Sequence, residues 1–412
     1  MALNLSAVFF YVKDFNAKGD GKTKDTSAIN KAIEVCSESG GGTVYFPAGT
    51  YLTGPVNLKS NIVLYIDAGA NILFSDDFDD YPAVWTRWGG CECYAYSPLI
   101  FAYGCSNVTI TGRGTVDGQG AAWWKVYKER MGSGRLYPVT ERDKEFAELN
   151  IACTAHGSGG GGWKSQFLRP PLIQIMKCSN VVIEGVTLKN SPFWNTHLLY
   201  SDGIVVNGVT ILNPHDAPNG DGIDIDSCKN VRISDSFIDA GDDCICLKSG
   251  MDEDGRRVGM PTENIAVTNC ILNHGHGGIV MGSDVSGGIR NVVVSNCTFI
   301  DTDRGIRIKA NRARGGVVED IQVSNVNMKR VFSPLVIHAY YCCGESPDNS
   351  FLFDKTTKPV TEKTPVFKNI HLSGVSAREV TASAGFIYGI PELPVENVTL
   401  TNVNIEMTQN PD

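Results

Sequence analysis

The chain has 412 residues with 45 acidic and 36 basic side chains, which gives a formal net charge of −9. No basic stripe with interleaved aromatic residues is present, so the sequence predicts no nucleic-acid partner. No apolar run approaches the roughly 18 residues of a membrane span, so we expect no membrane partner either. A small anionic ligand is still compatible with this composition, because a few Arg and Lys residues can dominate one cleft.

The N-terminal part predicts one helix followed by short strands. The start, MALNLSAVFFYVKDF, has no positively charged region and no cleavage site of a secretory leader, which favours a cytoplasmic location unless a leader is missing. Residues 25–40 contain an apolar stripe after Asp25 or Thr26 as a cap, and predict an amphipathic helix that covers one end of the fold. Strands are expected at 42–46 and 61–66.

Two segments, 76–98 and 119–170, fit no regular pattern, and we expect them to form long loops over a binding face. Large aromatic side chains in such loops are either loop anchors or flat platforms for sugars, and the sequence leaves both interpretations open. Five of the six tryptophans lie in these two segments: Trp85, Trp88, Trp123, Trp124 and Trp163.

From about residue 105 to the C-terminus, one short pattern repeats: Asn, a β-branched residue, any residue, and a second apolar residue. Its nine starts are Asn107, Asn180, Gly203, Asn230, Asn264, Asn291, Asp320, Asn369 and Asn397. The commonest interval is roughly 23 to 30 residues, which is typical of stacked repeats. Short alternating runs without helices predict an all-β protein, namely a single parallel β-helix in which each coil pairs with the next. We expect one domain, 1–412.

The 13 cysteines are placed as structural residues of the solenoid. Cys105, Cys178 and Cys228 each lie two residues before a repeat start, and Cys270 and Cys297 each lie six after one. Equivalent positions stack in the interior, so most of these thiols are expected to be reduced and buried. Cys270 and Cys297, on adjacent coils, are the best placed to cross-link. No Cys or His spacing matches a zinc site, so no metal is predicted.

The polar residues collect on four aligned strands: GDGIDID (220–226), DDCICLK (242–248), HGGIVMG (276–282) and DRGIRIK (303–309). Ile223, Ile245, Ile279 and Ile306 fall in one column of this alignment. It places Asp221 beside Asp243, and Asp242 beside His276. Asp226, Lys248, Gly282 and Lys309 form another column. Because neighbouring strands lie about 4.8 Å apart, the set covers roughly 15 Å, the length of a few sugar units.

Three acids at this spacing cannot all stay ionised, because like charges on adjacent strands raise one pKa. A protonated acid beside a charged carboxylate is what glycoside hydrolysis requires. An ordinary role for each acid alone is a turn residue, since Asp before Gly is common in turns. The adjacent pair Asp242–Asp243 in register with Asp221 favours catalysis instead.

Basic side chains accompany the acids. Arg307 and Lys309 alternate with apolar residues and point to one face, where they are either solvated or hold a carboxylate. Lys248 lies in the column of Lys309 and is a further candidate for substrate binding.

These residues carry a resemblance. Asn219-Gly220-Asp221-Gly222, Gly241-Asp242-Asp243, Gly275-His276-Gly277 and Arg307-Ile308-Lys309 resemble, in this order, the four motifs of the polygalacturonases, the pectin-cleaving glycoside hydrolases of family 28. The segments RPPLI at Arg169, SPFWNTH at Ser191 and KDFNAKGDGKTKDTSAINKAI near the N-terminus are also similar. The resemblance covers essentially the whole chain.

The resemblance implies a right-handed parallel β-helix that hydrolyses galacturonan with inversion and needs no metal or other cofactor. In this scheme Asp242 is the general acid, and Asp221 and Asp243 activate water. His276 supports the protonation state of the acid.

The same resemblance assigns substrate contacts. Arg307 and Lys309 hold the galacturonate carboxylate, and Tyr341, with Tyr340 as the alternative, is a subsite tyrosine. Asn219, within the first motif, is another expected substrate contact.

Two departures from the family pattern matter. The first motif reads Asn-Gly-Asp where Asn-Thr-Asp is usual, and we expect little effect because Gly220 only lacks a side chain. The segment 249–264 is longer than usual and, with 119–170, is expected to close one end of the cleft. A closed cleft admits only chain ends, which predicts exo cleavage, with Arg256 and Arg257 binding the terminal acidic sugar.

Other functions remain as alternatives. The family also contains rhamnogalacturonan and xylogalacturonan hydrolases, although the intact GHG and RIK motifs favour a galacturonan substrate. A β-helical pectate lyase would use the acids to bind calcium, and a non-catalytic β-helical carbohydrate binder would release no sugar. The oligomeric state does not follow from the sequence.

Overall fold

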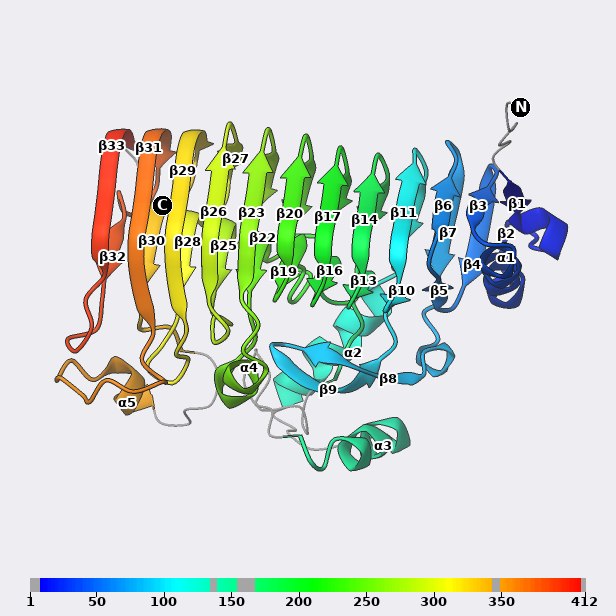
Figure 1. The fold of residues 1–412 in the computed structure, drawn as a ribbon, viewed down its shortest axis with the longest axis horizontal. Helices are drawn as coiled ribbons and strands as arrows, with labels where there is room; N and C mark the ends of the chain where they lie inside the picture. The colour runs from blue at the N-terminus through cyan, green and yellow to red at the C-terminus, as the bar shows by residue number, and fades with distance from the viewer. Residues whose placement is uncertain (1–7, 134–138, 154–166, 343–348, 409–412) are drawn as a thin grey trace.

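The computed structural model describes residues 8–133, 139–153, 167–342 and 349–408. Within these ranges the strands wind into a long parallel β-helix, with the N-terminal strands at one end and the C-terminal strands at the other (Figure 1). The fold predicted from the repeats is therefore confirmed.

Three parallel ladders run the length of the solenoid. One forms a sheet of 10 strands, and the other two merge into a sheet of 21 strands because the long strand at residues 317–329 pairs with both. The 10-stranded sheet contains β5 (Val56–Leu58), β10 (Ile100–Tyr103), β13 (Ile173–Met176), β16 (Thr196–Leu199), β19 (Ile223–Asp226), β22 (Asp243–Lys248), β25 (Gly277–Gly282), β28 (Arg304–Lys309), β30 (Ser333–His338) and β32 (Phe386–Tyr388).

The 21-stranded sheet joins the two remaining ladders. The first ladder contains β1 (Phe9–Tyr11), β3 (Gly42–Phe46), β6 (Ile62–Ile66), β11 (Ser106–Gly112), β14 (Ser179–Glu184), β17 (Asp202–Asn207), β20 (Lys229–Ser234), β23 (Thr262–Thr268), β26 (Ile289–Ser295), β29 (Val317–Lys329), β31 (Val366–Val380) and β33 (Glu396–Met407). The second contains β2 (Asp20–Lys24), β4 (Gly49–Thr53), β7 (Ala70–Phe74), β12 (Thr115–Asp117), β15 (Thr187–Lys189), β18 (Thr210–Leu212), β21 (Phe237–Ala240), β24 (Ile271–His274) and β27 (Thr298–Ile300).

The repeated asparagine marks the corner where each coil enters the first ladder. All nine predicted repeat starts have left-handed backbone, with φ from 49° at Asn397 to 70° at Gly203. Asn tolerates this conformation better than most residues. Its side-chain amide also bonds the next coil: Asn180 Nδ2 lies 2.8 Å from Asn107 Oδ1, and Asn291 Nδ2 lies 2.7 Å from Asn264 Oδ1. The pattern therefore reflects a ladder of stacked corner amides.

The N-terminal end is covered by the helix α1 (Thr26–Glu38), which lies within the predicted range 25–40. Ile29, Ile33 and Cys36 on one face of the helix are fully or almost fully buried in the core. A 3-10 helix, η1 (Val12–Phe15), packs beside α1. Apolar strand residues of the first coil are thereby removed from water, as a solenoid end requires.

The two predicted loop segments contain regular structure. Segment 76–98 holds the 3-10 helix η2 (Phe78–Asp80) and an antiparallel hairpin of β8 (Ala83–Trp88) and β9 (Cys91–Tyr96). Segment 119–170 holds α2 (Ala121–Ser133) and α3 (Glu141–Leu149) in its described part. Two further helices, α4 (Asp252–Val258) and α5 (Asn349–Phe353), lie on the same side of the solenoid as the hairpin (Figure 1).

Burial decides the role of most insertion tryptophans. Trp88, Trp123 and Trp124 are at most 9% exposed, so they anchor the insertions to the solenoid and do not form sugar platforms. Only Trp85 among the described members of the group has substantial exposure, at 38%. Trp163 lies outside the described residues.

The cysteines described by the structure are free thiols, and nearly all are buried. Cys105 and Cys178 stack on adjacent coils, where the Cys105 main-chain N–H donates to Cys178 Sγ at 3.3 Å. Cys270 and Cys297 are also both free. Their role is therefore that of small interior residues. Among the described residues, no helix combines the length and the hydropathy that crossing a membrane requires.

Candidate active site

The predicted motifs lie on four consecutive strands of the 10-stranded sheet. β19, β22, β25 and β28 pair in this order, and their interior Ile223, Ile245, Ile279 and Ile306 occupy one column. The alignment made from the sequence is therefore correct. Side chains that point away from the interior form two further columns: Asp224, Cys246, Val280 and Arg307 in one, and Asp226, Lys248, Gly282 and Lys309 in the other.

Asp221, Asp242 and Asp243 meet where β19 and β22 begin. One carboxylate oxygen of each residue lies within 4.8 Å of those of the other two. Asp221 and Asp243 are 3% and 1% exposed, whereas the Asp242 side chain is 19% exposed. The main chains are tied together as well, because Gly222 N–H donates to the Asp243 carbonyl at 3.0 Å. Of the three acids, Asp242 is thus the one that a ligand from solvent meets first.

His276 pairs with Asp242 on the neighbouring coil. Its Nδ1 lies 3.0 Å from Asp242 Oδ1, and its main-chain N–H donates to the Asp242 carbonyl at 3.1 Å. Gly275 makes this approach possible, since it has φ of 76° and a Cβ there would lie 2.4 Å from the Asp242 carbonyl oxygen. The hydrogen bond to Asp242 raises the pKa of His276, so the two side chains form a proton-holding pair.

The predicted cations adjoin the acids from β28. Lys309 Nζ donates to Asp243 Oδ2 at 2.7 Å and is buried, while Arg307 remains partly exposed. The Lys309 nitrogen and the Arg307 guanidinium carbon lie 5.0 and 5.3 Å from the centre of the Tyr341 ring. The structure thus brings Arg307, Lys309 and Tyr341 together, and it gives Lys309 a carboxylate partner within the protein.

Lys248 lies beneath the carboxylates. Its Nζ is 3.4 Å from Asp224 Oδ1 and 3.9 Å from Asp221 Oδ2, and it stands 4.6 Å above the ring of Trp194. Only 5% of Lys248 is exposed, as is the case for Lys309, and the acids and the tryptophan cover it, so these contacts give no direct support to the prediction that it touches substrate. Its charge acts on the site through Asp221 and Asp224.

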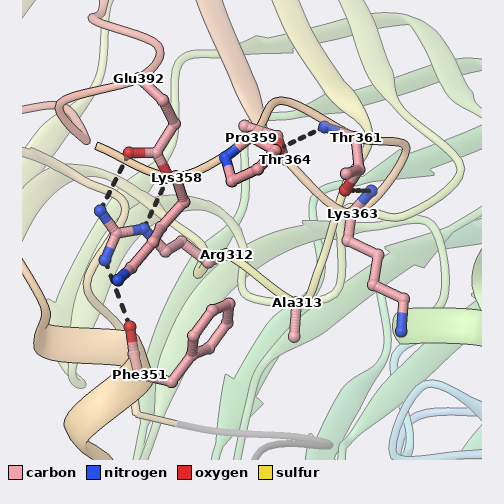
Figure 2. A pocket seen from close by; sticks show the side chains of 9 residues that line it. All are labelled: Arg312, Ala313, Phe351, Lys358, Pro359, Thr361, Lys363, Thr364 and Glu392. Atoms are coloured by element: carbon pink, nitrogen blue, oxygen red, sulfur yellow. Dashed lines mark hydrogen bonds and ion pairs between the residues drawn. The ribbon is translucent and has the colours of Figure 1, made fainter. Parts of the chain in front are cut away.

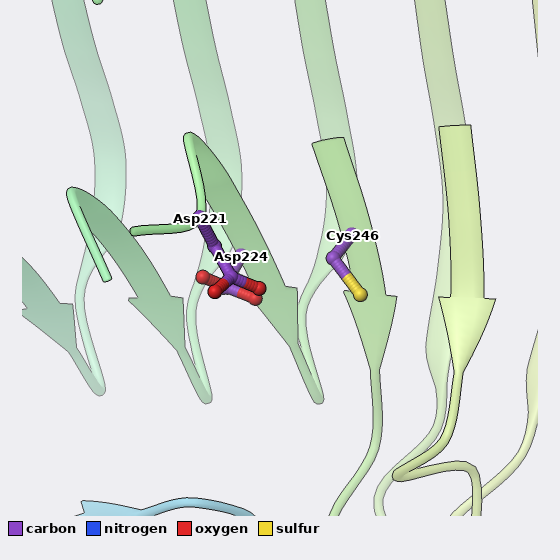
Figure 3. A group of neighbouring side chains, drawn as sticks. All are labelled: Asp221, Asp224 and Cys246. Carbon is purple, nitrogen blue, oxygen red and sulfur yellow. The ribbon is translucent and has the colours of Figure 1, made fainter. Parts of the chain in front are cut away.

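Asp224 is a member of the site that sequence reasoning missed. Figure 3 shows its carboxylate beside that of Asp221, with the Cys246 thiol on the next strand. Asp224 is fully buried, and neither of its oxygens has a hydrogen-bond partner among the described residues. The alternation of Asp in GDGIDID was the available signal, because residues 222, 224 and 226 share a side of the strand.

The four carboxyls carry unequal charge. Burial, together with the charges of Asp224 and Asp242, raises the pKa of Asp221 well above its usual range. Burial likewise raises the pKa of Asp224. At Asp243, burial is outweighed by Lys309, Arg307 and Lys248, which hold the pKa near 2. The site thus pairs a permanently ionised Asp243 with a neighbouring acid, Asp221, that tends to keep its proton.

Asn219 is held by a buried arginine from the RPPLI segment. Arg169 is 0% exposed, and its Nη2 donates to Asn219 Oδ1 at 2.8 Å. Its Nη1 donates to the carbonyls of Pro192 and Pro218 at 2.7 Å. Arg169 therefore fixes the turn that leads into Asp221.

The hairpin β8–β9 covers the sheet on one side of the acids. Thr86 Oγ1 donates to Gln174 Oε1 of β13 at 2.8 Å, and Arg87 Nη1 donates to Asp226 Oδ1 of β19 at 2.7 Å. Beneath the hairpin, Gln174, His197 and Asp226 are at most 1% exposed. The outward faces of β13, β16 and β19 are therefore closed. Beyond them Asp242 and Arg307 keep some exposure, while the outward Cys246, Val280 and Lys309 are buried.

The hairpin also reaches α4, which follows β22 in the chain. Met251 N–H donates to the Gly90 carbonyl at 2.8 Å, and Glu92 N–H donates to Asp254 Oδ2 at 3.0 Å. The expected wall thus exists in part, but the covering element is the hairpin of 76–98, with 249–264 as its support. The part of 119–170 nearest the insertion's end lies outside the described residues.

Arg256 and Arg257 on α4 have partners within the protein. Arg256 Nη1 donates to the carbonyls of Ala313 and Arg314 at 2.9 and 3.0 Å. Arg257 Nη2 lies 2.6 Å from both Glu92 and Asp254. Both arginines hold α4 in place, so these contacts give no support to the expectation that they bind the terminal sugar.

Two groups of donor atoms are close enough to hold a metal ion: Asp221, Asp242 and Asp243, and Asp221, Asp224 and Cys246. Lys309 and Lys248 already bring positive charge to within 2.7 Å of Asp243 and 3.4 Å of Asp224. The protein therefore supplies counter-charges to these acids from its own side chains.

Comparisons with known proteins agree with this geometry. The family profile described as "Glycosyl hydrolases family 28" matches residues 155–411, and one described as "Rhamnogalacturonase A/epimerase, pectate lyase-like" matches residues 9–81. A probable polygalacturonase of Vitis vinifera is 33% identical over 404 residues, which cover 96% of this chain and 73% of that protein. An endo-polygalacturonase of Pectobacterium carotovorum subsp. carotovorum is 32% identical over 399 residues, which cover 93% of this chain and 86% of that protein.

Solved structures give the same picture. The crystal structure of a hyperthermoactive exopolygalacturonase from Thermotoga maritima matches with a TM-score of 0.78 and 32% identity, and the match covers 98% of this chain and 93% of that one. Proteins named for exo action and for endo action thus both occur among the relatives.

Proposed function

The chain belongs to the glycosyl hydrolases of family 28, and from this we propose that it cleaves galacturonan from the chain end, with inversion at the anomeric carbon. It is a polygalacturonase-type hydrolase of pectin. The exo mode, the inversion and the residue roles are our proposal. The observation that carries it is the cluster of three acids beside a hairpin that covers the outward faces of β13, β16 and β19.

In the proposed reaction Asp242 is the general acid. It gives its proton to the glycosidic oxygen while the bond from that oxygen to the anomeric carbon breaks. The partial exposure of Asp242 and its 3.0 Å contact with His276 support this role, because the pair can retain one proton between turnovers.

Asp243 and Asp221 activate the water. Asp243 takes the proton of the water whose oxygen bonds to the anomeric carbon, so the proton balance closes with one given and one taken. The low pKa of Asp243, near 2, supports its assignment as the base, since it is ionised at any ordinary working pH. Asp221, with its raised pKa, is the neighbour that orients the water by a hydrogen bond.

Inversion rests on family membership and not on the spacing of the acids. Inverting glycosidases usually separate their two carboxyls by about 6.5–9.5 Å, and retaining ones by about 5–5.5 Å. Here the nearest oxygens of all three acids lie within 4.8 Å of one another. We propose that the water occupies the space beside Asp221 and Asp243 and attacks from the side opposite to Asp242. Proton NMR of the first product formed tests this, because inversion yields the β-anomer from an α-linkage.

The hairpin supports exo action. A polymer that crosses the site needs open sheet on both sides of the acids, but β13, β16 and β19 are covered by β8 and β9. In this proposal one terminal sugar unit lies between the acids and the hairpin. The remaining units extend over β25 and β28, where Arg307, Lys309 and Tyr341 provide cations and a ring for a galacturonate carboxylate.

Product analysis on polygalacturonate tests the proposal. We expect galacturonate monomer as the first product, with slow loss of viscosity, and no release by Asp242→Asn. Early mixed oligomers with rapid viscosity loss would contradict exo action. An unsaturated product that absorbs in the ultraviolet would indicate a lyase. Release of rhamnose-containing or xylose-containing units, with none from polygalacturonate, would indicate another activity of the family.

A cytoplasmic location, as expected from the sequence, also stays a proposal. Fractionation of cells that express the natural gene, followed by immunoblotting of each fraction, tests it. Recovery from the medium or the periplasm would contradict it.

A further inference from the structure

The outward columns of the site continue beyond Arg307 and Lys309 over two more strands. In the first column, Arg307 of β28 pairs with Val336 of β30, which pairs with Phe386 of β32. In the second column, Lys309 is followed by His338 and then by Tyr388. His338, Phe386 and Tyr388 therefore form an aromatic strip on the same face as the acids.

The aromatic strip is open where the other side of the site is closed. Phe386 and Tyr388 are 48% and 43% exposed, and His338 is partly exposed. The ring of His338 lies 5.9 Å from that of Phe386 and 6.1 Å from that of Tyr341. The strip is thus continuous with the tyrosine beside the predicted substrate cations.

A lysine supplies charge to the strip. Lys355 is exposed, and its Nζ stands 5.3 Å from the centre of the Tyr388 ring. Tyr388 also stacks on Tyr340, with ring centres 4.9 Å apart. Exposed aromatic side chains with one nearby cation suit an acidic sugar, because the aromatic surface that water reaches packs against the apolar face of the sugar and the ammonium group pairs with its carboxylate.

The segment that carries Lys355 is held by a buried arginine. Arg312 is 3% exposed, and its guanidinium donates to the carbonyls of Phe351 and Thr356 at 3.2 and 3.1 Å and also to that of Asp354. It also binds both carboxylate oxygens of Glu392, at 2.7 and 2.9 Å (Figure 2). These bonds fix the chain on both sides of Lys355.

The pocket next to this arginine is less suited to a ligand than the strip. It has a volume of about 440 Å³, and Figure 2 shows Arg312, Phe351, Lys358 and Glu392 among its lining residues. Its charges are matched within the protein, since Arg312 pairs with Glu392 and Lys358 pairs with Asp354. We therefore assign it a structural role.

We propose that the aromatic strip, together with Lys355, binds galacturonate units of the substrate beyond those at Arg307 and Lys309. The inference rests on the proposed function and extends it, because it names the preferred substrate as longer oligogalacturonates. β32 lies two strands beyond β28, which adds about 10 Å at roughly 4.8 Å per strand. Only substrates long enough to span this distance from the acids gain the additional contacts.

The test compares substrates of different length on a double variant, Phe386→Ala with Tyr388→Ala. We expect kcat/KM to fall roughly tenfold for long oligogalacturonates, on the scale of two lost aromatic contacts, and to stay unchanged for the dimer. The loss should lie in KM and not in kcat, since contacts far from the bond that breaks are made equally before and during the reaction.

Ile387→Ala is the matched control. Ile387 lies between the two aromatic residues, is 42% exposed, and pairs with Ile337 of the interior column. It tests the stability of the last coil without removing a ring from the strip. Lys355→Met changes an exposed side chain and gives a second variant with little risk to folding. We expect it to weaken the binding of long substrates in low salt, with a smaller effect in high salt.

Each outcome decides the inference. The inference is overturned if kcat/KM of the double variant falls equally for the dimer and the long substrates, or does not fall at all. It is also overturned if Ile387→Ala lowers kcat/KM by the same factor. A change of oligomeric state by light scattering, with unchanged kinetics, would show that this surface binds a second copy and would also overturn it. Failure of the unaltered protein to cleave the dimer and polygalacturonate would instead refute the proposed function itself.

Discussion

Replacing Arg87 by Met is expected to release the hairpin from the sheet and to change the products. The side chains of Arg87 and Asp226 are both 0% exposed, and their ion pair measures 2.7 Å. Arg87 Nη1 also lies 2.9 Å from Ser227 Oγ, and the guanidinium stands 4.6 Å from the centre of the Tyr200 ring. This one side chain therefore connects β8 to the last residue of β19.

The magnitude follows from the burial of the pair. Loss of one partner of a buried ion pair typically costs about 3–5 kcal/mol, because the other charge stays buried and uncompensated. Burial alone would raise the pKa of Asp226, but Arg87 and His197 hold it at about 2. Without Arg87, Asp226 must stay charged at this cost, take up a proton, or gain access to water. Each of these weakens the contact between hairpin and sheet.

Hydrogen exchange measures the effect locally, which suits a solenoid because its parts can open independently. About 3 kcal/mol corresponds to roughly a hundredfold faster exchange of the hairpin amides at 83–96. The same variant should lower the viscosity of a polygalacturonate solution more for each bond cleaved, because the opened sheet admits internal segments of the polymer.

Two controls separate the buried pair from general damage. Arg87→Met combined with Asp226→Asn removes both charges and should recover most of the lost protection. Arg257→Met removes exposed hairpin contacts, since that side chain is 57% exposed beside Glu92 and Asp254, and such pairs are worth about 0–1 kcal/mol. If the hairpin exchanges freely in Arg87→Met while galacturonate monomer remains the first product, the hairpin is not the cause of exo action.

Three further predictions concern the acids. Asp242→Asn should lower kcat by about 10²–10⁴-fold, the usual contribution of a general acid, while calorimetry shows retained binding of oligogalacturonate; near-normal kcat would remove Asp242 from that role. His276→Gln should move the basic limb of the pH profile of kcat to lower pH. The hydrogen bond to Asp242 raises the pKa of His276, so the pair holds its proton to higher pH than it would without the imidazole. An unmoved limb would contradict the shared proton. Lys309→Met should move the acidic limb of the same profile to higher pH. Burial then acts on Asp243 without its nearest cation, so the pKa of Asp243 rises from about 2. The pH dependence of kcat at saturating substrate checks this, and an unchanged limb would count against Asp243 as the base.

The solenoid and its columns were predictable because they are periodic. A corner residue with left-handed backbone recurs in each coil, so Asn107, Asn180 and their equivalents set the frame of the alignment. Once one interior column is fixed, every outward neighbour follows by alternation. The contact of His276 with Asp242 is a direct consequence. The contact of Lys309 with Asp243 is not, because Asp243 pairs with Gly277 and lies outside the column of Lys309.

The covering elements were not predictable in the same way. Segment 76–98 has no repeat from which a register could be read, so nothing in its pattern pairs Arg87 with Asp226, which lies 139 residues away. Side-chain pairing is equally hidden in the sequence. Acids of the protein already bind Lys248, Lys309 and Arg257, and their role as substrate contacts stays a prediction.

The charges along the columns bear on the proposed exo action. At the covered end, Arg87 neutralises Asp226, and the raised pKa of Asp224 favours its neutral form. Three strands later, roughly 15 Å away, Arg307 on β28 keeps a partly exposed guanidinium. A polyanion is attracted to the charge that water leaves accessible, so its body should lie toward β28 while a terminal unit reaches the acids.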